Sequence, residues 1–278
     1  MQVLNYFTSG SGRQLFKNIY LGLMRFYFSF FDHRPTNEQC IVFAPHQDDE
    51  TLGCGGTIIQ KIRKGASVKV VFMTDGNNSH KHIGDYDLKE VRREEALAAC
   101  KVLGIDSDNV IFLDQTDGKL SDSFDVAVDK VVGILEASKP NEVYVPYIRD
   151  HHPDHKATNN IVLGAVRKVG ARTMIYEYPT WFWDHWPVVE VKIKRKKEFL
   201  SHLKTSFISA YSVLRELRCS VRITNVIDVK RNALDKHKSQ ITRINDDEKW
   251  FVLGDVSQGE WLDSFFRDRE VFHKYACP

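Results

Sequence analysis

The sequence IVFAPHQDDE, residues 41–50, joins an apolar run to a dense polar cluster. Its first four residues are β-branched, aromatic or small, and a short apolar run of this kind is typical of a buried strand. Pro45 ends the run, and an imidazole and three carboxylates follow directly. The stretch therefore predicts a strand of a buried sheet with a reactive loop at its end.

Outward from this stretch, strand-like and helix-like segments alternate. The strand-like segments are 40–44, 67–73, 109–113, 142–145 and 173–178, and the helix-like segments are 56–64, 88–103, 124–138 and 156–169. In the clearest helix, apolar side chains share one face and Gly104 follows as a stop signal. Alternation at this spacing predicts an α/β fold, with a mainly parallel sheet covered by helices on both faces.

Polar segments follow four of the predicted strands. These segments are 46–50, 74–76, 114–118 and 150–155. In an open parallel sheet, sites form outside the carboxyl ends of the strands. We therefore expect the four segments to meet at one edge of the sheet.

Two of these segments contain candidate metal ligands. His46 and Asp49 are two residues apart, so both can reach one ion from a turn or from the first turn of a helix. A catalytic zinc takes three histidine or carboxylate ligands and keeps a fourth position for water. His155 is a suitable third ligand, because it begins a predicted helix at the same edge. The set predicts Zn²⁺, although another divalent transition metal would suit the same ligands.

The same segments supply an acid–base set. Asp48 is adjacent to a ligand yet free to point elsewhere, so it is the expected general base for the metal-bound water. His152 is expected to stabilise the oxyanion and protonate the leaving group, with Asp154 orienting its imidazole and keeping it protonated. The predicted reaction class is hydrolysis of an unactivated amide or ester.

Each motif also has an ordinary structural explanation. His-x-x-Asp occurs by chance on protein surfaces, and the run from His152 to His155 also fits a loop whose aspartate caps a helix. The position of both motifs after predicted strands favours the functional interpretation.

The composition is that of an ordinary globular protein. A net charge of +2 over 278 residues is too small to indicate nucleic-acid binding. Five cysteines without a CxxC pair are typical of reduced thiols in a cytoplasmic protein. The basic run 192–197 fits either a solvated helix face or a contact with anionic lipid or phosphate.

The two ends of the chain differ from this regular core. Residues 1–38 are expected to form an N-terminal amphipathic helical segment, and residues 39–278 a single domain with a C-terminal extension from about residue 180. Charged helices are expected near 195–203 and 229–244. Residues 15–31 are too short and too interrupted to span a bilayer. They fit either a helix packed on the domain or on a second subunit of a homo-oligomer, or an in-plane anchor on the inner face of a membrane.

The polar motifs resemble those of the PIG-L/LmbE-like deacetylase family. The resemblance rests on Pro-His-Gln-Asp-Asp-Glu at 45–50 and His-Pro-Asp-His at 152–155, and is supported by 74–76, 92–104, 113–118 and 237–240. Gln47 departs from the pattern, since the family commonly has proline there, and we expect only a local change of the loop. The family includes de-N-acetylases of N-acetylglucosaminyl-phosphatidylinositol and of mycothiol and bacillithiol precursors.

The resemblance implies a Rossmann-like fold, a variable C-terminal part and a set of site residues. By resemblance, zinc is held by His46, Asp49 and His155, the general base is Asp48, and the acid group is His152 with Asp154 behind it. Candidate substrate contacts are Arg92, Asp117, Trp181 and His237. The tryptophan-rich segment 181–187 fits a platform for a sugar ring, and equally a hydrophobic plug or a subunit contact.

The predicted function is zinc-dependent removal of the acetyl group from an N-acetylglucosamine-type sugar or glycoconjugate, either soluble or lipid-linked. Two alternatives stay open. One is an amidase or esterase that acts on a non-sugar acyl compound. The other is a non-catalytic glycan-binding protein on the same fold.

Overall fold

The computed structural model describes residues 11–79, 87–191, 196–243 and 247–277. Most of the basic run 192–197 lies outside the described residues, as do the first ten residues of the N-terminal segment. Within the described ranges, no helix is long and apolar enough to cross a membrane.

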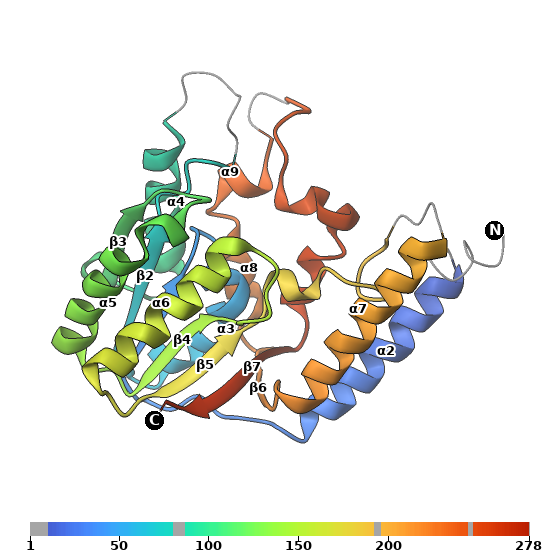
Figure 1. Ribbon diagram of the computed structural model, residues 1–278, viewed down its shortest axis with the longest axis horizontal. Coiled ribbons are helices and arrows are strands. Elements are labelled where there is room, and N and C mark those ends of the chain that lie inside the picture. Colours follow the sequence, from blue (N-terminus) through green and yellow to red (C-terminus); the bar gives the residue numbers. More distant parts are fainter. Residues whose placement is uncertain (1–10, 80–86, 192–195, 244–246, 278) are drawn as a thin grey trace.

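A seven-stranded sheet forms the centre of the molecule (Figure 1). Its strands are β1 Cys40–Ala44, β2 Val68–Thr74, β3 Val110–Gln115, β4 Glu142–Pro146, β5 Met174–Tyr178, β6 Cys219–Arg222 and β7 Arg269–Ala276. The spatial order is β3-β2-β1-β4-β5-β7-β6. Strands β1 to β5 pair in parallel, whereas β7 runs antiparallel to both β5 and β6. The predicted mainly parallel sheet is confirmed, and the chain's last strand extends it.

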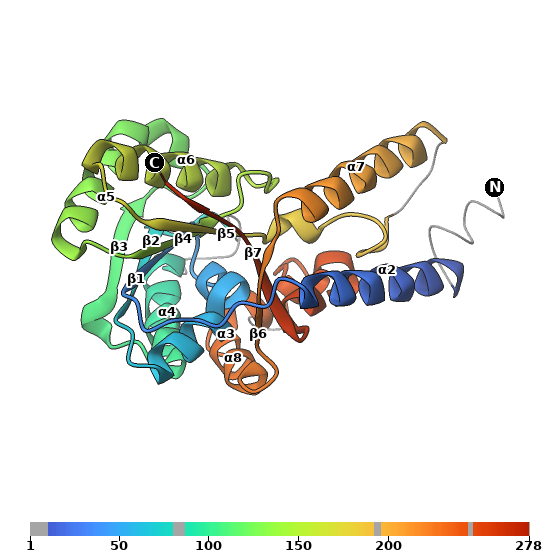
Figure 2. The ribbon, with the colours of Figure 1, turned by 90° about the horizontal axis from the view of Figure 1, so that it is seen from below.

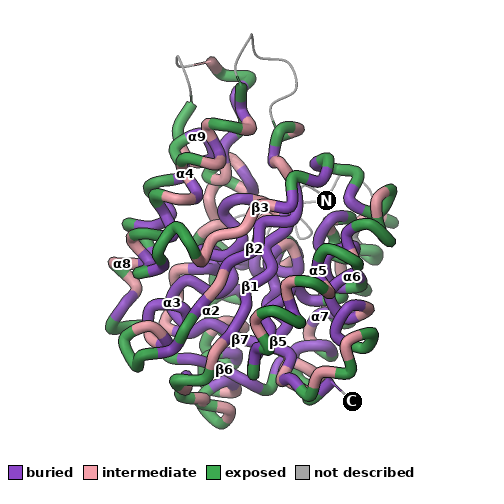
Figure 3. The backbone as a smooth tube through the Cα atoms, turned by 90° about the vertical axis from the view of Figure 1, so that its left-hand side faces the viewer, coloured by how far each residue is buried: buried purple, intermediate pink, exposed green. Residues whose placement is uncertain are grey.

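Helices cover both faces of the sheet (Figure 2). One face carries α3 Asp49–Arg63, α4 Leu88–Leu103 and α8 Ile227–Leu234, and the other carries α5 Phe124–Ser138 and α6 Pro153–Val169. Strand β1 contributes to both cores, because successive side chains of a strand point to opposite faces. Val42 packs in the first core and Ile41 and Phe43 in the second. Strand β1 is accordingly buried throughout, and β2 is buried at every residue except the half-buried Lys69 (Figure 3).

Helix α3 begins earlier than its apolar pattern indicates. The sequence predicts a helix from residue 56, but the structure begins it at Asp49, within the polar cluster. Glycines at its start hide the periodicity and permit close packing. A Cβ atom on Gly53 would lie 2.2 Å from the Tyr178 ring, and one on Gly56 would lie 2.5 Å from Ile223. The close approach of α3 to the sheet therefore fixes the direction in which Asp49 points.

The remaining helices depart further from expectation. The structure has α7 at Lys196–Arg215, and it divides the helix expected near 229–244 into α8 and the short α9 Lys238–Ile241, because the chain turns at 235–237. Helix α2, Ser11–Ser29, confirms the expected N-terminal helix. Short 3₁₀ helices lie at Ser107–Asn109, Leu120–Ser123, Trp181–Trp183, Leu253–Gly259 and Leu262–Phe266.

A third cluster of apolar side chains joins the two ends of the chain. Met24 and Phe28 of α2 pack with Trp183, Val213 of α7 and Trp261. The inner face of α2 is thus part of the folded unit, although its outer face is exposed.

Candidate active site

The polar segments that follow β1 to β4 do meet at the carboxyl edge of the sheet. They enclose a pocket of about 290 Å³. Its walls contain seven of the ten candidate site residues, namely His46, Asp48, Asp49, Arg92, Asp117, His152 and Trp181. The other three candidates, Asp154, His155 and His237, lie behind this surface and are buried.

One carboxylate oxygen lies between two imidazoles. Asp49 Oδ2 is 3.3 Å from His46 Nδ1 and 3.2 Å from His155 Nε2. Asp49 is the first residue of α3, and His155 lies in the first turn of α6, so two helix starts bring them together. His155 Nδ1 contacts Asp150 Oδ2 at 3.1 Å, which directs its other nitrogen towards Asp49.

These side chains fit a divalent metal ion. His155 Nε2 is buried and lies 3.2 Å from Asp49 Oδ2, but this contact does not have the geometry of a hydrogen bond. Among the described residues the hydrogen-bonding capacity of this nitrogen is therefore unused. Burial lowers the pKa of His155, but Asp49 and Asp150 outweigh it and raise the pKa to about 9. An excess of carboxylates around imidazoles is an environment that attracts a cation. The nearest ring nitrogens of His46, His152 and His155 also lie within 4.8 Å of one another.

The second nitrogen of His46 faces two further carboxylates. His46 Nε2 is 3.2 Å from Asp117 Oδ1 and 3.3 Å from Asp154 Oδ2. The Asp154 carboxylate also accepts the backbone N–H groups of Gly118 at 2.7 Å and Leu120 at 3.2 Å. Asp117 and Asp154 thus orient His46, as outer carboxylates commonly do for a metal-binding histidine.

This position of Asp154 differs from the expected one. Its carboxylate contacts His46 and not His152. Its backbone N–H donates to His152 Nδ1 at a distance of 3.3 Å. Burial and the nearby imidazoles of His46 and His155 lower the pKa of His152 to about 4. The structure therefore contradicts the expectation that Asp154 keeps His152 protonated, because the Asp154 carboxylate faces His46.

Asp48 lies beside the candidate metal ligands His46 and Asp49, in a strained backbone conformation. Its φ angle is 147°, which is rare for a residue with a side chain. Its backbone N–H donates to Glu50 Oε2 at 3.0 Å, and its carboxylate lies 3.6 Å from Arg92 Nη2. Burial raises the pKa of Asp48 to about 6, although Arg92 acts in the opposite direction. A carboxyl group with a pKa in this range is suited to act as a base near neutral pH.

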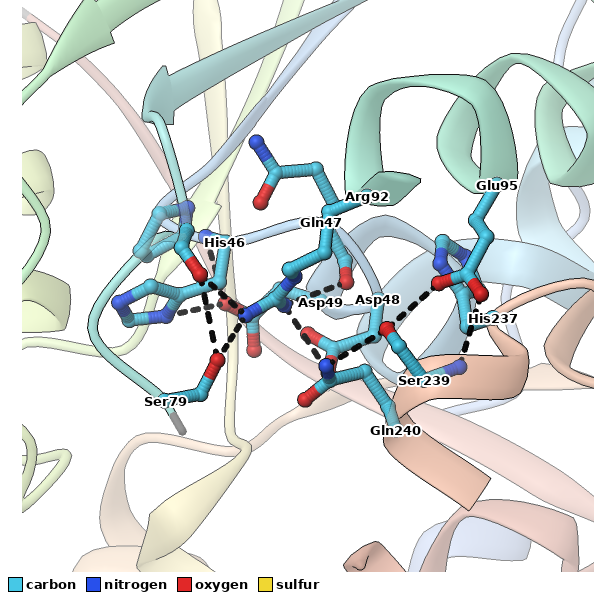
Figure 4. Close-up of polar contacts among 12 residues, drawn as sticks. His46, Gln47, Asp48, Asp49, Ser79, Arg92, Glu95, His237, Ser239 and Gln240 are labelled. Carbon is cyan, nitrogen blue, oxygen red and sulfur yellow. Dashed lines mark hydrogen bonds and ion pairs between the residues drawn. The ribbon is translucent and has the colours of Figure 1, made fainter. Parts of the chain in front are cut away.

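Arg92 connects the loops around Asp48 (Figure 4). Its guanidinium is buried and donates to Gln47 O at 2.7 Å, Gly76 O at 3.2 Å and Ser79 Oγ at 2.8 Å. The Gln47 side chain adds a further link, since its Nε2 donates to Thr74 O at 2.9 Å. Gln47, the departure from the family pattern, therefore joins the loops after β1 and β2.

His237 does not face the pocket. It is fully buried, and its Nε2 lies 3.0 Å from Glu50 Oε1. Burial lowers the pKa of His237, but Glu50 and Asp48 outweigh it and raise the pKa. The expected substrate contact at His237 is contradicted by this burial. In the 237–240 motif, the residue that lines the pocket is instead Gln240.

Trp181 forms part of the pocket wall. Its ring stacks on Trp261 with centroids 4.5 Å apart and lies 6.3 Å from the His152 ring. The other tryptophans of segment 181–187 have different positions, because Trp183 is buried in the core and Trp186 lies between α2 and α7. The expected tryptophan platform is thus limited to Trp181, with Trp261 as a partner that the sequence did not indicate.

The pocket also contains residues that sequence reasoning missed. These are Leu52, Asn78, Ser79, Gly118, Gln240, Leu253 and Trp261. Asn78 and Ser79 lie two and three residues after the 74–76 motif, so a longer window around that motif would have included them. Gln240 lies inside the 237–240 motif, in which only His237 was chosen as a candidate. Leu253 and Trp261 lie in a segment without regular periodicity, and no sequence signal indicated them.

An open, mainly parallel sheet with histidine and carboxylate side chains gathered at its carboxyl edge has its polar cluster where Rossmann-like α/β proteins form their ligand sites. The family described as "PIG-L: GlcNAc-PI de-N-acetylase" matches residues 41–166 of the chain. This match includes both polar motifs of the candidate site.

Known proteins extend the likeness over most of the chain. The chain is 26% identical over 231 residues to the probable N-acetyl-alpha-D-glucosaminyl L-malate deacetylase 2 of Bacillus cereus, which covers 80% of this chain and 93% of that protein. The solved N,N'-diacetylchitobiose deacetylase of Pyrococcus horikoshii has a TM-score of 0.62 at 21% identity and covers 94% and 93% of the two chains. A zinc-inhibited form of teicoplanin deacetylase has a TM-score of 0.60 at 17% identity and covers 86% and 98%. These two structures show the same fold.

Proposed function

We propose that this protein is a metal-dependent N-deacetylase acting on an N-acetylglucosamine-type sugar or glycoconjugate. The observation that carries the proposal is the position of Asp49 Oδ2 between His46 Nδ1 and His155 Nε2, with the Asp48 carboxyl group beside them. The family match and the Bacillus cereus relative, whose name gives an N-acetylglucosaminyl malate as substrate, support the choice of an acetylated sugar.

His46, Asp49 and His155 would hold the metal. Two imidazole nitrogens and a carboxylate are a donor set that zinc commonly takes in hydrolases, and other divalent transition metals accept it too. When bound, the ion supplies a water molecule that is acidic enough to become a nucleophile near neutral pH. Asp117 and Asp154 keep the His46 ring in the ligating orientation.

Asp48 accepts the proton of the attacking water. Its raised pKa allows it to take this proton and later pass it to the departing amine. The hydrogen bond that its backbone N–H donates to Glu50 and the contact of its carboxylate with Arg92 limit the directions in which the carboxylate can point.

His152 stabilises the oxyanion as a neutral donor. Its Nδ1 accepts the Asp154 N–H, so the ring proton resides on Nε2. His152 lines the pocket. A neutral Nε2–H there would donate to the carbonyl oxygen as negative charge develops on it. This role does not require a protonated imidazole, in agreement with the lowered pKa.

The pocket wall supplies the contacts for the sugar. Trp181 and Trp261 present apolar ring surface on one side, and Asn78 and Gln240 present amide groups. A sugar ring has an apolar face and polar edges, which matches this division. We further propose that residues 39–278 act as one cytoplasmic catalytic domain to which the segment 1–38 is attached.

The Asp48→Ala variant tests the mechanism. Turnover is expected to fall by about a thousandfold, because general base catalysis contributes 10²–10⁴-fold, while the bound metal measured by elemental analysis stays at the wild-type level. Asp108→Ala, at an exposed position of the first 3₁₀ helix, serves as the matched control.

Acetate release from N-acetylglucosamine conjugates and from simple acetamides gives the substrate class. Preferential hydrolysis of the sugar conjugates supports the proposal, whereas preference for simple amides would favour a general amidase. Full activity of Asp48→Ala, or a wild-type protein without bound metal that only binds glycans, would contradict the enzymatic proposal.

A further inference from the structure

Helices α2 and α7 lie away from the sheet (Figure 1), and both carry large apolar side chains that are exposed. The side chains that define this exposed surface are Leu23 and Phe26 of α2, Phe30 directly after α2, and Phe207, Tyr211 and Leu214 of α7, which are 52–72% exposed. We call this the two-helix surface. Contiguous exposed apolar side chains of this extent are typical of interaction sites.

An apolar groove runs between the two helices. Tyr27 Oη donates to Leu214 O at 2.7 Å and joins them at one end, and they diverge towards the other end (Figure 2). The groove has a volume of about 550 Å³ and is lined almost entirely by apolar atoms. Ile19 and Leu23 line one wall, and Leu203 and Phe207 line the other. The apolar faces of α2 and α7 therefore face each other across an open groove.

A row of cations borders the two-helix surface. Lys197, Lys204 and Arg215 are exposed, and their spacings of seven and eleven residues place them on one side of α7. Lys204 precedes Phe207 by three residues, and Tyr211 precedes Arg215 by four, so cation and apolar side chain are neighbours. Helix α2 contains no acidic residue, and the acidic residue of α7 is Glu198.

The charge pattern distinguishes between two occupants. A second copy related by two-fold symmetry would bring the same patch against itself, and the two helices of that patch offer one carboxylate, Glu198, to the three cations of the row. An anionic bilayer instead offers phosphates to the cations and acyl chains to the apolar side chains, and aromatic residues favour the boundary between them. We propose that the two-helix surface docks on an anionic phospholipid bilayer, with acyl-chain segments entering the groove.

Vesicle flotation tests this proposal directly. The probes are vesicles of phosphatidylcholine alone and vesicles of phosphatidylcholine and phosphatidylglycerol in equal amounts. The wild-type protein is expected to float with the mixed vesicles and much less with the neutral ones. High salt should weaken this binding, because it screens the attraction between the cations and the lipid phosphates.

A double and a triple variant separate the apolar from the electrostatic contribution to vesicle binding. Phe26→Ser with Phe207→Ser should weaken binding by about a hundredfold, from the loss of two inserted aromatic rings. Lys197→Gln with Lys204→Gln and Arg215→Gln should weaken it about fivefold for each cation. Val126→Ser on α5 and Lys101→Gln on α4 are exposed controls that should bind as the wild type does.

Thermal unfolding of each variant checks that the fold is retained, as expected for exposed positions. Absence of wild-type binding, or equal binding by all variants, would overturn the proposal. A lipid-free wild-type dimer, seen by sedimentation velocity and dissociated by Phe26→Ser with Phe207→Ser, would also overturn it and identify a second copy as the occupant. These readouts do not involve catalysis, so they are independent of the proposed enzymatic function.

Discussion

Asp48 is held in its strained conformation by a carboxylate that never reaches the pocket. Glu50 is fully buried and accepts the Asp48 N–H at Oε2, while its Oε1 accepts the Thr51 hydroxyl at 2.6 Å and contacts His237. The third carboxylate of the opening cluster thus supports Asp48, the proposed general base, from behind the pocket. Its partner His237 arrives from a segment far along the chain.

Removal of this carboxylate should be costly for stability. Glu50→Ala leaves His237 buried without its charged partner and the Asp48 N–H without an acceptor. Breaking a buried ion pair on one side costs about 3–5 kcal/mol. We expect the free energy of unfolding in urea to fall by about 3 kcal/mol. Glu38→Ala, at an exposed position, should leave it almost unchanged, and a comparable loss there would contradict the explanation.

At the scale of single residues, sequence predicted which side chains gather but not how they point. His46, Asp48, Asp49, His152 and His155 do meet, because strand ends and helix starts are readable from periodicity. The Asp154 carboxylate was assigned to the wrong imidazole. Spacing along a chain does not reveal which of two nearby rings a carboxylate faces, since that depends on the loop after β3.

At the scale of elements, close packing of α3 on the sheet sets the position of Asp49, a candidate metal ligand and the first residue of α3. Tyr178 of β5 is fully buried, and its hydroxyl donates to Phe43 O at 2.8 Å, so its ring cannot easily move away from α3. Gly53 faces this ring directly. A larger side chain at this position must displace either the tyrosine or the helix that begins with Asp49.

Two glycine substitutions in helices should therefore act in opposite directions. Gly53→Ala is expected to lower the free energy of unfolding by about 2 kcal/mol through overpacking. Gly22→Ala in α2 has nothing within 4 Å of the new Cβ and should raise it by about 1 kcal/mol through helix propensity. Urea denaturation of both variants measures the contrast. Equal effects of the two changes would mean that Tyr178 does not restrict α3.

Other elements were missed for physical reasons. Strands β6 and β7 are antiparallel additions to the sheet. Their apolar residues pack in different clusters, Phe272 in the first core and Val271 in the third cluster, so apolar and polar residues alternate only weakly along them. The helix expected near 229–244 is interrupted because His237 must enter the core beside Glu50. A tertiary contact of this kind cannot be read from local periodicity.

At the scale of the whole molecule, one carboxylate ties the N-terminal helix to the C-terminal part of the chain. Glu260 Oε1 lies 2.5 Å from Arg13 Nη2 and 2.8 Å from Lys17 Nζ, and its Oε2 accepts the Glu190 N–H at 2.7 Å. Both cations are buried on the inner side of α2. Since the opposite side of α2 carries exposed apolar residues, this clamp determines which face of the helix is presented outward.

The clamp should make the attachment of α2 dependent on pH. Burial raises the pKa of Glu260, but the hydrogen bonds from Arg13 and Lys17 outweigh it and lower the pKa below its ordinary value. A lowered pKa gives stability that is complete above the unfolded value of about 4.3 and disappears as pH falls through the folded value. The melting temperature of the wild type should therefore exceed that of Glu260→Gln at pH 7, and the difference should shrink below about pH 4. Glu94→Gln, exposed on α4, should show no such dependence, and a difference for Glu260→Gln that stays constant down to low pH would mean that the carboxylate charge does not hold α2 in place.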